Sequence, residues 1–505
     1  MGNTISGLSS SSSTPAPIAG GGAAGLAALE ALYQRDLVLL NLPVKRWTPV
    51  RTTSDGAPVA DVLIIGAGMA GICLAIALKH LGVPARLVDS APAGYEGPWD
   101  TTARMETLRS MKHLVGPALG FAHLTFQAWF TAQWGTAAWA ELGKIPRVQW
   151  MEYLRWLKRV NELEVENDTC VRRVQPSADG VATVEVQRGH SADAATEVIY
   201  ARHVVLATGR GGLGGAWLPR WAEDVPAERR AHSSDVWSGE SLKGLRVAVI
   251  GGGSSAMDCA GTALEGGAAE VHLLIRRHSL PLVNKSKASV GPGNTHGYPD
   301  FSDAWKWQLR HYIHVHIPPP HASTLRVSRH ANAFFHFDAP VERASVRDGD
   351  GRVRLDTPKG PIAVDFVIFA TGFATNWEQR PEFAPFAAHV LQWQDVYTPP
   401  ASQENTDMSL APYLGPHFEF REKVAGACPG LDHIHCFCYP ATLSYGAISG
   451  DIPQISDGAR MLAQGLAGSL CKEDLAEHFK VIQQYEEPEL DGDEWTAATW
   501  PPYTE

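Results

Sequence analysis

The chain lacks an excess of basic residues. Among its 505 residues, 43 Lys and Arg stand against 54 Asp and Glu, which gives a formal net charge of -11 at pH 7. A protein that binds nucleic acid needs a basic surface, and an anionic membrane surface would repel this chain. The sequence therefore predicts no nucleic-acid partner, and the acidic excess is attributed to solubility.

Cysteine is scarce and has no redox-active spacing. Seven Cys residues are scattered along the chain, no CxxC pair occurs, and no secretory signal precedes them. This pattern predicts reduced thiols in a cytoplasmic protein. An enzyme that reduces disulfides through a CxxC pair is thereby excluded.

A long uninterrupted apolar run is also absent. The most apolar stretch, from Val62 to Lys79, is broken by three glycines, so it predicts a strand, a turn and a helix rather than a membrane span. At the N-terminus, MGNTIS matches the pattern for myristoylation of Gly2, and a chance match in a disordered tail explains it equally well. One acyl chain would give only a weak membrane tether.

That apolar stretch carries a GxGxxG fingerprint between a strand and a helix. The first glycine permits the turn, the second lets the backbone approach a pyrophosphate, and the third lets the helix pack closely. Asp89 ends the next strand, where an acid binds a ribose, so we predict an FAD site. The residues assigned to FAD here are Gly66, Gly68, Met69, Ala70, Gly71 and Asp89. A further match at Gly20–Gly25 follows no strand and is rejected.

A second fingerprint follows the strand VAVI, with Ala in place of the third glycine. Two arginines end the next strand, where the first unit has its acid. A guanidinium fork there suits a 2′-phosphate, which favours NADPH over NADH. The residues assigned to NADPH are Gly251, Gly253, Ser254, Ser255, Ala256, Arg276 and Arg277.

Two similar strand ends, His203–Arg210 and Asp365–Phe373, contain Ala-Thr-Gly and indicate crossings between domains. We predict an α/β fold with two dinucleotide-binding Rossmann-like domains, the NADPH domain being inserted into the FAD domain. Small residues let the chain turn beside a cofactor, so Thr208, Gly209, Thr371 and Gly372 are further cofactor candidates. The expected segments are a disordered tail (1–25), a helix and linker (26–58), the first FAD part (59–212), the NADPH domain (213–372), and the second FAD part with the C-terminal region (373–505).

The paired fingerprints, their order and the LATG and DFVIFATGF strand ends resemble the class B flavoprotein monooxygenases. This group includes flavin-containing, N-hydroxylating and Baeyer–Villiger monooxygenases, and the resemblance covers about Asp61 to Gly458. It implies that NADPH reduces FAD and that O2 then forms a flavin C4a-hydroperoxide. The hydroperoxide would oxygenate a nitrogen, a sulfur or a ketone of a small substrate.

The motifs of each subgroup match only in part. Gly97-Pro98-Trp99 resembles the GxW of the Baeyer–Villiger group and makes Trp99 a cofactor candidate. Pro281–Lys285 resembles the Pro-Phe-Val-Asn-Glu segment of the N-hydroxylating group and makes Asn284 a catalytic candidate. The subgroup and the substrate therefore stay open.

The segment METLRSMKHLVGP resembles one that passes near the flavin ring in these enzymes. Arg109 and Lys112 are therefore predicted to stabilise the reduced flavin or the peroxide. A solvated loop or pairing with surface acids is the equal alternative for these side chains.

Histidines gather in HYIHVHIPPPH and HIHCFC, but neither run has the spacing of a structural zinc site. We predict no metal. The favoured function is an NADPH- and FAD-dependent monooxygenase that uses O2 and a small molecule. The alternatives are an NADPH oxidase or quinone reductase without oxygen transfer, and a membrane-tethered redox sensor or binding protein. The oligomeric state is left open.

Overall fold

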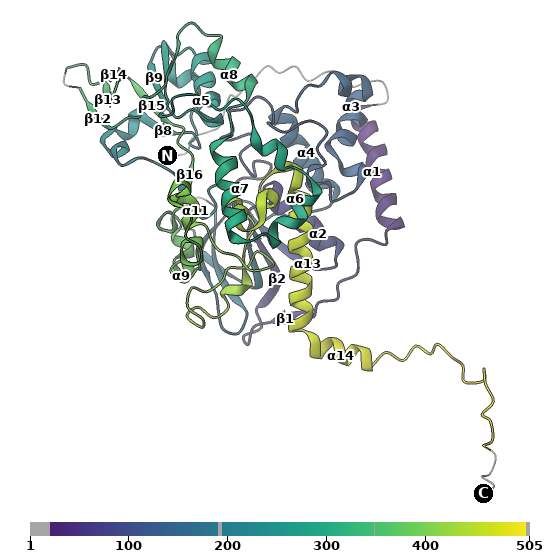
Figure 1. The fold of residues 1–505 in the computed structure, drawn as a ribbon. Helices are drawn as coiled ribbons and strands as arrows, with labels where there is room; N and C mark the ends of the chain where they lie inside the picture. Colours follow the sequence, from purple (N-terminus) through teal and green to yellow (C-terminus); the bar gives the residue numbers. More distant parts are fainter. Residues whose placement is uncertain (1–20, 190–193, 348, 501–505) are drawn as a thin grey trace.

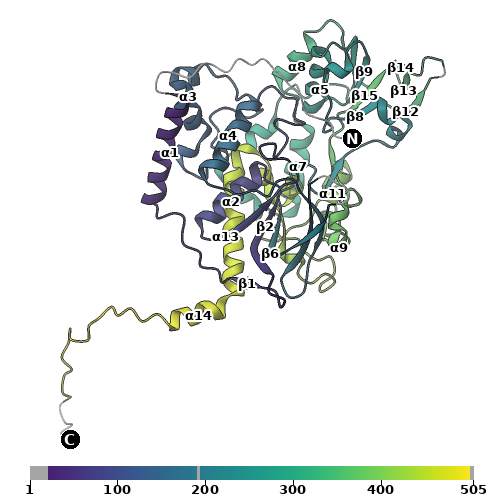
Figure 2. The same ribbon diagram turned by 180° about the vertical axis from the view of Figure 1, so that it is seen from behind.

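The computed structural model describes residues 21–189, 194–347 and 349–500. Gly2, the predicted myristoylation site, and Gly20 of the rejected third fingerprint lie outside these ranges. In the described ranges, we find no helix that combines the length and the apolarity needed to cross a membrane. Figures 1 and 2 show two lobes side by side, with a C-terminal segment that extends away from both.

The larger lobe is built on a sheet whose parallel core has the order β3-β2-β6-β17. Antiparallel strands β4 and β5 continue from the first half of β6, and β1 pairs with β2. Helices α2 and α13 pack together beside this sheet (Figure 2). The strands are β1 (Arg51–Thr52), β2 (Pro58–Ile65), β3 (Ala85–Val88), β4 (Thr169–Gln175), β5 (Ala182–Arg188), β6 (Thr196–Leu206) and β17 (Ile434–Cys436).

The smaller lobe contains a five-stranded, fully parallel sheet of order β11-β10-β9-β15-β8. Helices α5 and α8 pack on each other, and an antiparallel meander β12-β13-β14 lies at the far edge of the lobe (Figure 1). The strands are β8 (Arg230–His232), β9 (Arg246–Ile250), β10 (Glu270–Leu274), β11 (Ala333–His336), β12 (Arg343–Val346), β13 (Val353–Thr357), β14 (Gly360–Val364) and β15 (Phe366–Phe369).

The chain crosses between the lobes on two adjacent strands. The outgoing strand β7 (Gly214–Ala216) pairs antiparallel with the returning strand β16 (Phe373–Thr375). The smaller lobe is thus inserted into the larger one, which confirms the predicted fold class. The crossings lie next to the predicted boundaries at 213 and 372.

The helices have the following bounds. They are α1 (Gly22–Leu39), α2 (Met69–His80), α3 (Phe126–Glu141), α4 (Arg147–Val160), α5 (Ser254–Glu265), α6 (Pro292–Gly297), α7 (Asp303–Val315), α8 (His321–Ser328), α9 (Ala384–Ala387), α10 (Trp393–Val396), α11 (Thr406–Leu410), α12 (Thr442–Tyr445), α13 (Ile455–Glu473) and α14 (Leu475–Gln483). Helix α1 begins four residues before the predicted start of the N-terminal helix segment.

Helices α6 and α7 lie against the larger lobe, although their sequence falls inside the predicted NADPH segment. Trp307 of α7 is fully buried in a cluster with Trp393 and Leu443, which come from the second FAD part. The Tyr298 hydroxyl also donates to the carbonyl oxygen of Leu443 at 3.3 Å. Burial of these large aromatic rings decides the position of the segment.

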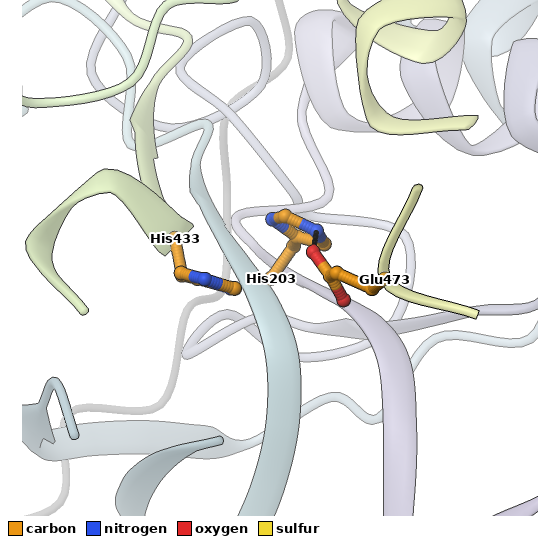
Figure 3. Close-up of side chains that lie close together, drawn as sticks. All are labelled: His203, His433 and Glu473. Carbon is orange, nitrogen blue, oxygen red and sulfur yellow. Dashed lines mark hydrogen bonds and ion pairs between the residues drawn. The ribbon is translucent and has the colours of Figure 1, made fainter. Parts of the chain in front are cut away.

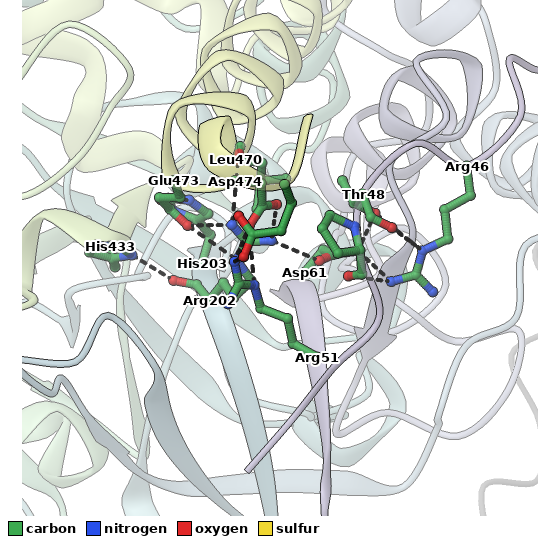
Figure 4. A network of polar contacts seen from close by, with 12 residues as sticks. Arg46, Thr48, Arg51, Asp61, Arg202, His203, His433, Leu470, Glu473 and Asp474 are labelled. Carbon is green, nitrogen blue, oxygen red and sulfur yellow. Dashed lines mark hydrogen bonds and ion pairs between the residues drawn. The ribbon is translucent and has the colours of Figure 1, made fainter. Parts of the chain in front are cut away.

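A buried ionic network joins the end of α13 to β2 and β6 (Figure 4). The Arg202 guanidinium, 2% exposed, donates to Asp474 at 2.7 Å, to Glu473 at 2.7 Å and to Asp61 at 3.3 Å. Arg51 also binds Asp474. Desolvation opposes ionisation of Glu473, yet hydrogen bonds and charges from His203 and Arg202 lower its pKa to about 2. The network therefore favours the ionised forms of Glu473 and Asp474 and holds the end of α13 against the sheet.

Candidate active site

The first glycine turn has the backbone geometry that a pyrophosphate site requires. Gly66 has φ 105°, and a Cβ there would lie 2.5 Å from the carbonyl oxygen of Ala207, so only glycine fits. At Gly68 the nearest atom to an added Cβ is the Cα of Gly97, at 3.8 Å. The turn is therefore closed toward the protein and open toward the side where a phosphate would lie.

Asp89 is held at this turn by two backbone amides. Its carboxylate accepts hydrogen bonds from the N–H groups of Ala67 and Ala91, each at 2.7 Å. Burial raises the pKa of Asp89, and both hydrogen bonds oppose that shift. The carboxylate thus lies at the end of β3, in the position expected for a ribose contact.

The second turn repeats this geometry at the end of β9. Gly251 has φ 133°, and a Cβ there would lie 2.7 Å from the carbonyl oxygen of Ala370. No atom lies within 4 Å of a Cβ added at Gly253. Both turns therefore present open backbone at the N-terminus of a helix, α2 or α5, where phosphates bind.

One cavity of about 2680 Å³ contains both turns. A typical pocket for a small ligand has roughly 300–1,000 Å³, so this volume suits two dinucleotides and a substrate. The predicted residues that line it are Gly66, Gly68, Met69, Ala70, Asp89, Trp99, Arg109, Thr208, Gly209, Gly251, Gly253, Ser254, Ser255, Arg276, Arg277, Asn284, Thr371 and Gly372. Gly71 and Ala256 lie behind the wall, as their role in helix packing requires.

The two arginines after β10 differ in their contacts. Arg277 donates to the carbonyl oxygen of Val315 at 2.9 Å. Arg276 is exposed and lines the cavity, and among the described residues its guanidinium has no hydrogen bond or ion pair. Arg276 is therefore the more available of the two for a 2′-phosphate.

The three predicted catalytic residues have distinct surroundings. Lys112 donates to the carbonyl oxygens of Trp139 and Ala140 at the end of α3, and it does not line the cavity. Arg109 pairs with Asp258 of α5 at 3.1 Å, while burial lowers the pKa of its guanidinium. Asn284 accepts from the backbone and hydroxyl of Ser286. Lys112 therefore has a helix-capping contact, and a flavin contact for it remains a prediction.

Charged residues that the sequence did not reveal line the same cavity. Arg210 lies over the ring of Tyr439, with 4.4 Å between guanidinium carbon and ring centroid. In the described part of the chain, neither Arg210 nor Arg310 has a hydrogen bond or ion pair. Burial raises the pKa of Asp407 and of Asp451, and nearby arginines oppose both shifts. Arg210 directly follows the LATG strand end, so the sequence motif could have revealed it. Arg310, Asp407 and Asp451 come from α7, α11 and the loop before α13, where no motif marks them.

His203, His433 and Glu473 bring nitrogen and oxygen atoms within 4.8 Å of one another (Figure 3). The imidazoles of His203 and His433 stack at 4.8 Å with an interplanar angle of 16°, so their lone pairs do not converge on one point. Glu473 already accepts from Arg202 and contacts His203 at 3.1 Å. This cluster is part of the ionic network, and the prediction of no metal remains a prediction.

Residues 58–306 match the family model of the L-lysine 6-monooxygenases and L-ornithine 5-monooxygenases. The FAD-dependent urate hydroxylase of Xanthomonas campestris pv. campestris is 35% identical over 478 residues, which cover 94% of this chain and 99% of that relative. The chain belongs to the class B flavoprotein monooxygenases. The matched family consists of monooxygenases and the full-length relative depends on FAD, so this chain is an FAD-dependent monooxygenase that transfers one oxygen atom from O2 to a small molecule.

Solved structures of flavin monooxygenases share the fold. The reduced ornithine hydroxylase of Pseudomonas aeruginosa has a TM-score of 0.61 at 16% identity, covering 81% of this chain and 98% of that one. An ornithine N-hydroxylase from Kutzneria sp. 744, solved with reduced FAD, NADP+ and L-ornithine, has a TM-score of 0.61 at 17% identity, with coverage of 82% and 100%. The family model describes lysine and ornithine monooxygenases, whereas the full-length relative is a urate hydroxylase, so the subgroup stays open.

Proposed function

We propose that this monooxygenase hydroxylates a small oxopurine, with urate as the first candidate. The observation that carries the proposal is the polar set in the cavity, which combines unpaired guanidinium donors with carboxyl acceptors. An oxopurine alternates N–H donors and C=O acceptors around a flat ring, and this pattern matches Arg210 and Arg310 with Asp407 and Asp451. The full-length likeness to a urate hydroxylase supports the same substrate class.

The protein's own groups would bind the cofactors and the substrate and would shield the reacting atoms from water. Bound FAD supplies electron transfer from NADPH and the activation of O2. Arg276 binds the 2′-phosphate, and the turns at Gly68 and Gly253 hold the two pyrophosphates. Arg210 and Arg310 orient the substrate, while the surrounding wall excludes water from the reacting atoms.

The direct test measures NADPH consumption by the FAD-loaded enzyme with urate, ornithine or lysine present. We expect urate to accelerate consumption and to yield a hydroxylated product in equal amount. Acceleration by ornithine or lysine with formation of an N-hydroxy product would contradict the oxopurine assignment. Consumption that yields only hydrogen peroxide with every substrate would instead favour the oxidase alternative.

Arg310→Met is expected to raise KM for urate by about 10–100-fold, since a lost hydrogen bond to a charged group costs about 1.5–3 kcal/mol. The FAD content and the rate of flavin reduction by NADPH should not change. Steady-state kinetics and stopped-flow absorbance measure the two effects. Arg329→Met, a change at an exposed arginine outside the cavity, is the matched control. A normal KM in Arg310→Met would remove this residue from the substrate site.

Arg276→Ala is expected to raise KM for NADPH by about 10–100-fold and to leave KM for NADH nearly unchanged, because only NADPH carries the 2′-phosphate. Comparison of the two coenzymes within one variant separates a lost phosphate contact from general damage. An equal rise in KM for both coenzymes would show that Arg276 does not bind the 2′-phosphate.

A cytoplasmic location and a weak tether through acylated Gly2 belong to the same proposal. All seven cysteines are free, including Cys436 and Cys438, whose sulfur atoms lie 3.5 Å apart. Free thiols at this distance fit a reducing compartment. Membrane partition of Gly2→Ala against the wild type tests the tether, and equal partition would refute it.

A further inference from the structure

Residues 475–500, which we call the C-terminal arm, project away from both lobes (Figures 1 and 2). The arm consists of α14 and an irregular segment that follows it. Apart from the half-buried His478, its residues are exposed. They include two tryptophans, Trp495 at 60% and Trp500 at 84% exposure. Large apolar side chains gathered in one exposed segment mark an interaction site.

Helix α14 turns its apolar stripe toward solvent. Leu475, Phe479 and Ile482 have the i, i+4, i+7 spacing of one helix face, and each is more than half exposed. Two polar residues contact the body of the protein instead: His478 packs on Trp47 with ring centroids 5.5 Å apart, and Glu477 lies 4.0 Å from Arg51. An amphipathic helix with this orientation lacks a partner for its apolar face.

The root of the arm is fixed rather than loose. Asp474, the residue before α14, is fully buried and bound by Arg51 and Arg202. The direction in which α14 leaves the body is therefore set before any partner binds. Such preorganisation lowers the entropy lost on association.

A surface of opposite charge lies at the end of α1. Four exposed apolar side chains there form what we call the N-terminal patch: Val38, Leu39, Leu40 and Val44. The exposed basic residues Arg35 and Lys45 lie beside the patch in sequence, whereas Arg46 is already paired with Asp61. The arm, in contrast, carries the acidic residues Glu486, Glu487, Glu489, Asp491, Asp493 and Glu494. The two surfaces are thus both apolar and of complementary charge.

We propose that the C-terminal arm of one copy docks on the N-terminal patch of a second copy, and that the exchange is reciprocal in a two-fold dimer. Burial of Phe479, Tyr485, Trp495 and Trp500 in both arms would remove roughly 1,000 Å² from water, which is what a specific interface needs. The acidic arm argues against an anionic membrane as the partner. A two-fold axis makes both contacts identical and closes the assembly.

The test uses the full-length, FAD-loaded protein in sedimentation velocity at several concentrations. We expect the wild type to dimerise, and Phe479→Asp in the arm and Leu39→Asp in the patch to be monomeric with unchanged FAD content. Val481→Asp, an exposed position on α14 away from the apolar stripe, is the matched control and should still dimerise.

Mixing the two monomeric variants distinguishes exchange from other arrangements. The mixture retains one intact arm–patch contact, so a weaker dimer should reappear at higher concentration. A wild type that stays monomeric at every concentration, as when the arm folds onto its own patch, would overturn the proposal. Dimers that persist in both variants would also overturn it, because the interface would then lie elsewhere.

Discussion

Gly253→Val is expected to give a folded, yellow protein in which NADPH reduces the flavin roughly 100-fold more slowly. The added side chain meets no protein atom within 4 Å of its Cβ, so the fold should tolerate it. It would instead occupy the space through which the backbone approaches the NADPH pyrophosphate. Stopped-flow absorbance after mixing with NADPH measures the effect, and reduction by dithionite should be normal.

The matched control is Gly68→Val at the other turn, where an added Cβ would meet only the Cα of Gly97, in ordinary van der Waals contact at 3.8 Å. This variant should fold but be purified colourless, and added FAD should no longer raise its unfolding temperature. A Gly68→Val protein that retains FAD while Gly253→Val loses it would reverse the two cofactor assignments. Normal behaviour of both variants would remove the turns from cofactor binding altogether.

Arg202→Met is expected to lower the free energy of unfolding by about 3–5 kcal/mol, the usual cost of removing one partner from a buried ion pair. Met fills much of the same volume, but Glu473, Asp474 and Asp61 would lose their shared cation. Asp474 is fully buried and Asp61 is 2% exposed, so water cannot replace the lost contacts. Denaturant unfolding followed by fluorescence and circular dichroism measures the change.

Arg188→Met is the control for this prediction. Arg188 also joins two carboxylates, Glu166 and Glu197, but its side chain is 40% exposed. An exposed pair contributes about 0–1 kcal/mol, so this variant should unfold almost like the wild type. Equal destabilisation by both changes would contradict the distinction between buried and exposed pairs. A stable Arg202→Met would show that the buried ion pairs of Arg202 contribute little to holding α13 against the sheet.

The glycine turns were accessible from the sequence because each is a short run with its strand and helix directly attached. The contacts of Lys112 were not accessible in this way. The carbonyl oxygens that Lys112 binds belong to Trp139 and Ala140, 27 and 28 residues further along the chain, and no local sequence pattern predicts that contact. The placement of α7 against the larger lobe likewise depends on Trp307 meeting Trp393 and Leu443, which lie far away in sequence.

The sequence by itself determined the two dinucleotide turns, the inserted order of the domains and the family. These properties rest on backbone geometry and helix polarity, which are set by neighbouring residues. Only the tertiary structure decided that Arg210 and Arg310 share a cavity with Asp407 and Asp451, and that Arg202 clamps Asp474. Such contacts join segments brought together by burial of distant apolar surfaces, and residue order alone does not specify them.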